Sequence, residues 1–82
     1  MIIKYFAWLK NITKIEEEEI IDQSIVDVKT LKKYLCNKYP KLDSYINHDN
    51  IIRVAINFEY TVDNDVIEPH DEVALFPPVS GG

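Results

Sequence analysis

The chain has 82 residues, 46% of them hydrophobic, and a formal net charge of −5 at pH 7. This length corresponds to one domain, and the acidic balance argues against nucleic acid, whose phosphates would be repelled. No apolar run approaches the about 20 residues of a membrane span, and the single cysteine, Cys36, excludes an internal disulfide or a Cys-rich metal site. The start, Met1 to Phe6, lacks the features of a signal peptide, so we expect a cytoplasmic protein with no membrane partner.

The first part of the chain predicts two strands. Residues 2–9 alternate with period two, which places Ile3 and Tyr5 on one face and a partly exposed Phe6 on the other. Residues 17–22 predict a second strand, hairpinned to the first across a polar break. The run of glutamates before Ile20 is typical of a solvated edge strand, and an ion site is the less favoured alternative because no further ligand pattern accompanies it.

A helix is predicted to begin after Asp27, whose side chain can cap the first turn. Pro40 ends the helix, because a proline disfavours helical backbone in the residue before it. Cys36 lies on the flank of the apolar stripe and is predicted to be a small buried hydrophobe rather than a reactive thiol. The stripe, which should pack on the inner face of the sheet, consists of Val28, Leu31, Leu35 and Tyr39.

The second half predicts further strands. Residues 41–50 are polar and turn-like, and residues 51–57 predict a strand with residues 61–62 as a short hairpin partner. Residues 72–76 predict the final strand. Its two faces carry Val73 and Leu75 on one side and Ala74 and Phe76 on the other.

The order of elements is strand, strand, helix, strand, short strand, strand. It favours an α+β fold of the β-grasp (ubiquitin-like) type, a mixed sheet packed on one main helix with the first and last strands adjacent and parallel. The spacing alone leaves a ferredoxin-like sandwich open. We expect one domain over residues 1–76, followed by an extended tail, residues 77–82.

The tail holds the only two glycines of the chain, Gly81 and Gly82. Glycine lets backbone approach another surface closely, and Pro77-Pro78 should run extended and stiff. The pattern predicts a strand, a rigid spacer and a thin end that carries a bare α-carboxylate. A Gly-Gly ending taken alone can also arise by chance.

The full ending is more specific than the dipeptide, because residues 71–82 have the sequence DEVALFPPVSGG. This stretch closely resembles the C-terminus of the small, sulfur-carrier subunit of molybdopterin synthase (the MoaD type). Upstream, Ile3 to Ala7 resembles the first strand of that family and Val54 to Asn57 a later one. One small departure is Ser80, where many members of the family have threonine.

The resemblance implies a β-grasp fold and a chain that is not an enzyme on its own. A separate ATP-dependent enzyme would adenylate the Gly82 carboxylate, and a sulfur donor would convert it to a thiocarboxylate. The tail would then enter the large subunit of molybdopterin synthase, where the sulfur passes to cyclic pyranopterin monophosphate in molybdenum cofactor biosynthesis. No bound cofactor or metal is implied.

The resemblance also implies which residues meet the partners. Gly82 is the residue that is activated, and Phe6, Tyr60 and Phe76 match exposed apolar positions that pack against the large subunit. The remaining tail residues that would line the partner channel are Pro77, Pro78, Val79, Ser80 and Gly81.

Three alternatives remain at this point. A sulfur carrier of the thiamine pathway shares the fold and the Gly-Gly end. A ubiquitin-like protein modifier would instead join its terminal glycine to lysines. A purely structural interaction domain would not need the tail.

Overall fold

The computed structural model describes residues 1–77. In chain order the elements are β1 (Ile2–Tyr5), α1 (Leu9–Thr13), β2 (Glu17–Glu19), α2 (Val28–Lys38), a 3₁₀ turn η1 (Pro40–Leu42), a π-helical turn η2 (Ser44–His48), β3 (Arg53–Ile56), β4 (Glu59–Tyr60) and β5 (Glu72–Phe76).

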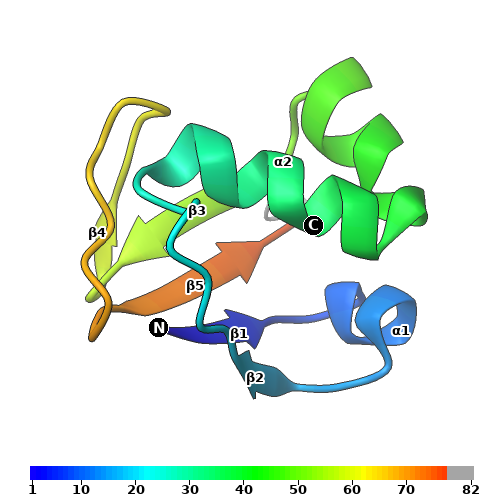
Figure 1. The fold of residues 1–82 in the computed structure, drawn as a ribbon. Helices are drawn as coiled ribbons and strands as arrows, with labels where there is room; N and C mark the ends of the chain where they lie inside the picture. Colours follow the sequence, from blue (N-terminus) through cyan, green and yellow to red (C-terminus); the bar gives the residue numbers. More distant parts are fainter. Residues whose placement is uncertain (78–82) are drawn as a thin grey trace.

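Within residues 1–77 the strands form a five-stranded sheet in the order β2-β1-β5-β3-β4. β1 and β5 are parallel, and the other neighbouring pairs are antiparallel. α2 lies across one face of the sheet (Figure 1). This arrangement confirms the predicted β-grasp. A ferredoxin-like sandwich is excluded, because its first strand would lead through a crossover helix to a strand parallel to it, whereas β1 leads to β2, with which it pairs antiparallel.

The hydrophobic core lies between α2 and the inner face of the sheet. Val73 and Leu75 of β5 are fully buried, while Ala74 and Phe76 on the outer face are only half-buried, as the alternation predicted. Burial of each large aliphatic side chain contributes about 1.5–3 kcal/mol. The core residues that meet these two from other elements are Ile3, Tyr5, Val28, Leu31, Leu35 and Val54.

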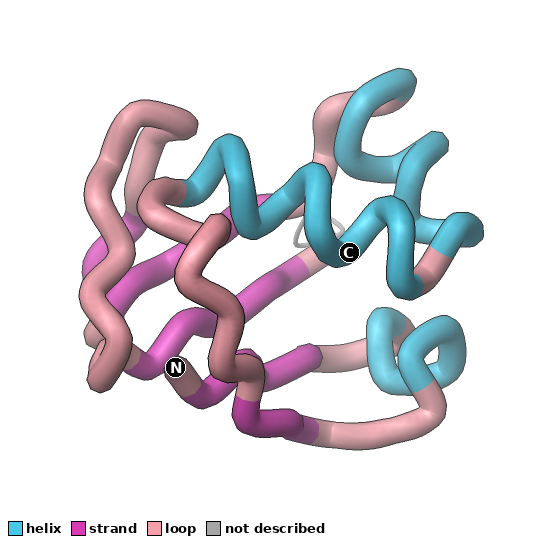
Figure 2. The backbone as a smooth tube through the Cα atoms, viewed as in Figure 1, coloured by secondary structure: helices cyan, strands magenta, loops and turns pink. Residues whose placement is uncertain are grey.

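The start of α2 is fixed by a capping box. Asp27 Oδ1 accepts a hydrogen bond from Thr30 N at 2.8 Å, and Thr30 Oγ1 accepts one from Asp27 N at 3.1 Å. The loop before β5 also meets this end of the helix, where the carbonyls of Asp63 and Asp65 accept from Lys29 N and Val28 N, each at 3.0 Å (Figure 2). The predicted cap is confirmed. Thr30 supplies the reciprocal hydrogen bond of the capping box, which the sequence pattern did not indicate.

The first strand is shorter than predicted. It ends at Tyr5 rather than residue 9, because Ala7 has a φ of 54° and the chain turns there into α1. The second strand likewise ends at Glu19 rather than residue 22. Cys36 is half-buried, and its Sγ accepts from Asn47 Nδ2 at 3.6 Å; burial raises the pKa of its thiol.

The second half needs two further corrections. The expected turn over residues 41–50 contains η1 and η2, which bury Leu42 and Ile46 in the core. The predicted hairpin partner at residues 61–62 is wrong. β3 pairs instead with β4, because the turn consists of Asn57 and Phe58 alone, which leaves Glu59 and Tyr60 in register with Ile56 and Ala55.

Turns in the described chain are built without glycine. Positive φ values occur at Ala7, Lys14, Asn50, Asn57 and Phe58. Asparagine tolerates this region, but a bulky side chain does so at a steric cost. Phe58, with a φ of 72°, stands where a two-residue hairpin normally has glycine, and its side chain is 92% exposed.

Glu18 joins the edge strand to the end of the helix. Its Oε2 accepts from Tyr5 Oη and Tyr39 Oη, each at 2.5 Å, and its Oε1 accepts from Lys38 Nζ. Burial alone would raise the pKa of Glu18, but the hydrogen bonds from Lys38, Tyr39 and Tyr5 outweigh it, so the pKa lies below its usual value. The acidic run does form an edge strand, as predicted, and one of its members is a structural tie.

We expect Glu18→Gln to lower the free energy of unfolding by about 1–3 kcal/mol at pH 7, because it removes charge-assisted hydrogen bonds from a largely buried site. Since the folded-state pKa is depressed, this contribution is present above the ordinary pKa of 4.5 and is lost as the pH falls through the lowered value. Urea unfolding of both proteins from pH 7 to pH 3 measures it. Glu19→Gln, on the exposed face of the same strand, is the control. The prediction is contradicted if the difference in free energy of unfolding between wild type and Glu18→Gln does not become smaller as the pH falls.

We expect Phe58→Gly to be more stable than Phe58→Ala by about 0.5–1 kcal/mol, because glycine relieves the positive φ at the expense of some backbone entropy. Both variants remove the same exposed ring, so their difference isolates the backbone term. Thermal and urea unfolding provide the measurement. Equal stability of the two variants would contradict the prediction, because the strain relieved by glycine would then be no larger than its entropy cost.

Candidate functional site: an aromatic cluster where the tail begins

β5 places the start of the tail beside the middle of the sheet. The strand lies between β1 and β3, ends at Phe76 and leads into Pro77, which is buried. The predicted site residues Pro78, Val79, Ser80, Gly81 and Gly82 lie outside the described residues. The boundary between domain and tail therefore stays a prediction.

Phe6, Tyr60 and Phe76 form an aromatic cluster on the outer face of the sheet. The rings of Phe6 and Phe76 stack at 4.9 Å with an interplanar angle of 18°, and the ring of Tyr60 meets that of Phe76 edge to face at 6.1 Å and 66°. Sequence reasoning named these three residues separately. The structure brings them together around the last residue of β5.

The strand register explains why the three rings meet. Phe6 N donates to Leu75 O at 3.1 Å, which continues the parallel ladder and sets Phe6 alongside Phe76. On the other side, Ala55 of β3 lies opposite both Ala74 of β5 and Tyr60 of β4. Two alanines between the rings leave room for the aromatic side chains to lie over the sheet.

The exposure of the cluster separates a binding surface from ordinary sheet packing. Phe6 is 42% exposed and Tyr60 is 74% exposed, while Phe76 is half-buried between them. An aromatic residue that only packs on a sheet would be half-buried, and Tyr60 is too exposed for that role. Contiguous exposed aromatic rings typically mark an interaction surface and supply much of the binding energy there.

Charged groups border the cluster on the same face. Lys4 of β1 lies diagonally across the ladder from Glu72 of β5 and forms an ion pair with it, and the hydrogen bond and charge of Glu72 raise the pKa of Lys4. Arg53 lies opposite Phe76 on β3 and is exposed. The surface is therefore apolar in its centre and charged at its edge, which is the usual arrangement of a protein interface.

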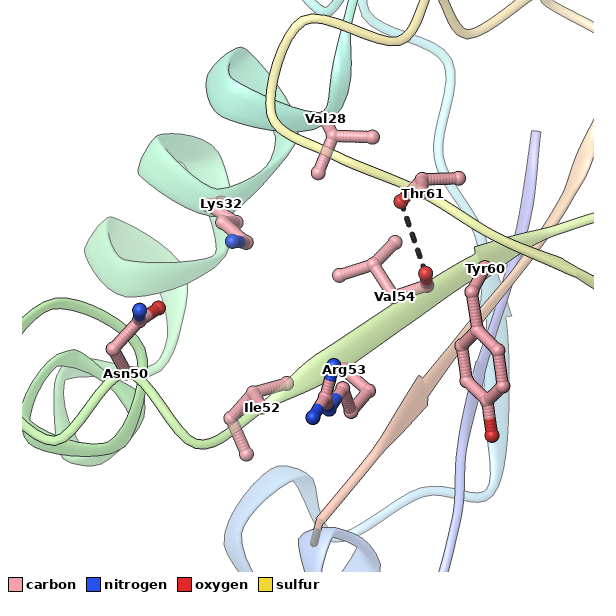
Figure 3. Close-up of a pocket in the computed structure, with 8 residues that line it drawn as sticks. All are labelled: Val28, Lys32, Asn50, Ile52, Arg53, Val54, Tyr60 and Thr61. Atoms are coloured by element: carbon pink, nitrogen blue, oxygen red, sulfur yellow. Dashed lines mark hydrogen bonds between the residues drawn. The ribbon is translucent and has the colours of Figure 1, made fainter.

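A cavity of about 260 Å³ adjoins the cluster between α2 and the edge of the sheet (Figure 3). Its lining includes Tyr60 of the cluster and Arg53 of the charged border, and Thr61 Oγ1 donates to Val54 O at 2.9 Å in its wall. Lys32, also in the wall, pairs with Asp63 at 2.7 Å. No sequence motif indicated this cavity, because its lining comes from three elements that meet only in the fold.

Two kinds of feature are absent from the described part of the chain. Among residues 1–77, no group of three or more His, Cys, Asp or Glu side chains is placed to hold a metal ion. In the same range no helix is long and apolar enough to cross a membrane. What the geometry shows is a partly exposed aromatic cluster at the end of β5.

The fold and this surface define the class of protein, which is a ubiquitin-like β-grasp domain. The chain belongs to the ThiS family, whose profile matches residues 3–82 and so includes the tail. The resemblance noted in the sequence is thereby confirmed at the level of the family.

Two relatives carry the same description, molybdopterin synthase sulfur carrier subunit. The human protein is 32% identical over 83 residues, which cover 98% of this chain and 91% of the relative. The Arabidopsis thaliana protein is 38% identical over 45 residues, which cover 55% of this chain and 44% of the relative, so the match spans less than half of that protein.

Solved structures give the same fold. SAMP1 from Haloferax volcanii superposes with a TM-score of 0.82 at 29% identity, covering 99% of this chain and 97% of its own. A putative molybdopterin converting factor, subunit 1, from Pyrococcus furiosus superposes with a TM-score of 0.82 at 26% identity, covering 95% of each chain.

Proposed function

We propose that this chain is the sulfur-carrier subunit of a molybdopterin synthase. The observation that carries the proposal is the aromatic cluster, which lies where β5 passes into a tail ending in Gly81-Gly82. The near end-to-end match to the human sulfur carrier subunit supports it. We propose that the chain acts in the cytoplasm.

In this proposal the chain is carried from one enzyme to another and is not the catalyst. The Gly82 α-carboxylate, with an ordinary pKa of about 3.5, is ionised and unreactive at neutral pH. A partner enzyme joins it to the α-phosphate of ATP, and pyrophosphate leaves. A sulfur donor then forms the carbon–sulfur bond as AMP leaves, which gives the thiocarboxylate.

The second partner is the large subunit of the synthase. The aromatic cluster docks on it, and the tail reaches the reaction site, where the sulfur passes to cyclic pyranopterin monophosphate and the carboxylate is regenerated. The six residues that follow Phe76, residues 77–82, can span at most about 20 Å when fully extended. The acceptor must therefore lie within about this distance of the surface that receives Phe76.

A second function, that of a protein modifier, is favoured by one comparison. A structural neighbour from Haloferax volcanii, 26% identical with a TM-score of 0.81, is described as small archaeal modifier protein 1. A modifier would use the same activated glycine but transfer the whole chain to a lysine. A thiamine-pathway carrier differs from the proposal only in the acceptor of the sulfur.

We expect the intact chain, incubated with ATP, its activating enzyme and a sulfur source, to gain the mass of one oxygen replaced by sulfur, located at Gly82. Deletion of Gly82 should abolish the gain and leave the fold unchanged, because the fold is built by residues 1–77. Val62→Ala, at an exposed position outside the tail and the cluster, is the control and should load normally. The proposal is contradicted if the wild-type chain stays unmodified while the same activating enzyme loads another sulfur carrier.

We expect Phe76→Asp to weaken binding to the large subunit at least about tenfold, since it places a charge in the centre of an apolar contact. Titration calorimetry with the purified large subunit measures the affinity, and circular dichroism checks the fold. Phe58→Asp changes an equally aromatic, more exposed residue outside the cluster and should bind like wild type. Equal loss in both variants would mean that the cluster is not the docking surface.

A further inference from the structure

A second surface lies at the opposite end of the sheet from the aromatic cluster. We propose that the groove between the segment after β2 and the segment before β5 binds a basic, amphipathic segment of a partner protein. The groove has a volume of about 580 Å³ and lies where β1 and β5 begin, beside Met1. The inference goes beyond the proposed function and does not depend on sulfur loading.

The groove has a fixed floor. Ile20 N donates to Met1 O at 2.9 Å and the Met1 amine donates to Ile20 O at 3.0 Å, which ties the first wall to β1. Ile67 N donates to Val26 O at 3.0 Å, which ties the second wall to the first; Figure 2 shows the two loops side by side. Ile20 and Ile67 are buried at the base. The groove is thus formed before any partner arrives.

Exposed apolar side chains converge on this groove. Ile21 is 86% exposed, Val66 is 65% exposed and Val26 is more than half exposed, and all three line it. Single exposed aliphatic residues are ordinary, but three around one depression form a patch. All three are β-branched, so they lose little rotamer freedom when a partner covers them.

The rim of the groove is acidic. Glu19, Asp22 and Glu68 line it, and the one cation in its lining, the Met1 amine, is engaged by Ile20 O. Asp22 Oδ1 accepts from Ser24 N at 2.8 Å and from Ser24 Oγ at 2.6 Å, and these bonds lower the pKa of Asp22, so it is charged at neutral pH.

The charge on the rim selects the occupant. Phosphates of nucleic acid or anionic lipid would face like charge, whereas Lys or Arg flanking an apolar segment would be attracted. Because β1 and β5 both begin at this groove and run toward the cluster, a partner bound here leaves the cluster at the end of β5 uncovered. The groove therefore suits a protein that holds the carrier while its tail is engaged elsewhere.

The test is an NMR titration of the full, unloaded chain with two synthetic peptides of equal length, one alternating Leu and Lys and the other alternating Leu and Glu. We expect the Lys peptide to shift the amides of residues 19–26 and 66–68, and the Glu peptide to leave them in place. Binding of both peptides alike, or shifts centred on Phe6, Tyr60 and Phe76, would overturn the proposal. Concentration-dependent shifts at the groove without peptide would assign it to a second copy of this chain instead.

A matched pair of variants tests the groove itself. Val66→Lys should weaken binding of the Lys peptide at least tenfold, because it puts a like charge in the wall. Val62→Lys changes a valine of nearly equal exposure, 68%, on the same loop but outside the groove lining, and it should bind the peptide like wild type. Equal weakening in the two variants overturns the proposal. Sulfur loading is measured separately, so failure of either proposal leaves the other standing.

Discussion

The parallel pairing of β1 with β5 is the constraint on which the rest of the molecule depends. It runs from Ile2 opposite Glu72 to Tyr5 opposite Leu75. The same ladder turns Ile3 and Leu75 toward α2, and it sets Phe6 beside Phe76 on the other face. A register slip of one residue would exchange the two faces, bury charge and disperse the aromatic cluster. Core and surface are therefore fixed by one pairing.

The two faces of the sheet divide the work between stability and recognition. α2 covers one face and holds the aliphatic core, with Glu18 tying the edge strand to the end of the helix. The other face is not covered by a helix (Figure 1), so its side chains can meet another protein. On it, small Ala55 and Ala74 let neighbouring rings lie close to the backbone. Recognition thus uses the face that the core does not need.

Sequence periodicity was sufficient for the parts of the fold that depend on local pattern. The Asp27 cap, the apolar stripe of α2 and the alternation of β5 are encoded by neighbouring residues, and each was confirmed. The end of β1 at Tyr5 was missed because it depends on a positive φ at Ala7 that no local rule requires.

Features formed by residues that are distant in sequence could not be predicted from a local pattern. The ties from Glu18 to Tyr5 and Tyr39, and the cavity that joins Arg53 to α2, need the folded chain. Phe6, Tyr60 and Phe76 were found through the family resemblance and the strand faces. Their mutual stacking could only come from the register.

The parallel ladder also has a mechanical consequence. A force applied between the start of β1 and the end of β5 acts along both strands in opposite directions, because the strands run the same way. The evenly spaced backbone hydrogen bonds then bear the load together in shear, rather than opening one after another. On its other edge β5 is held by β3 through an antiparallel ladder. A force that pulls on the chain after Phe76 would therefore be shared by the whole β1–β5 ladder and would not open the domain one hydrogen bond at a time.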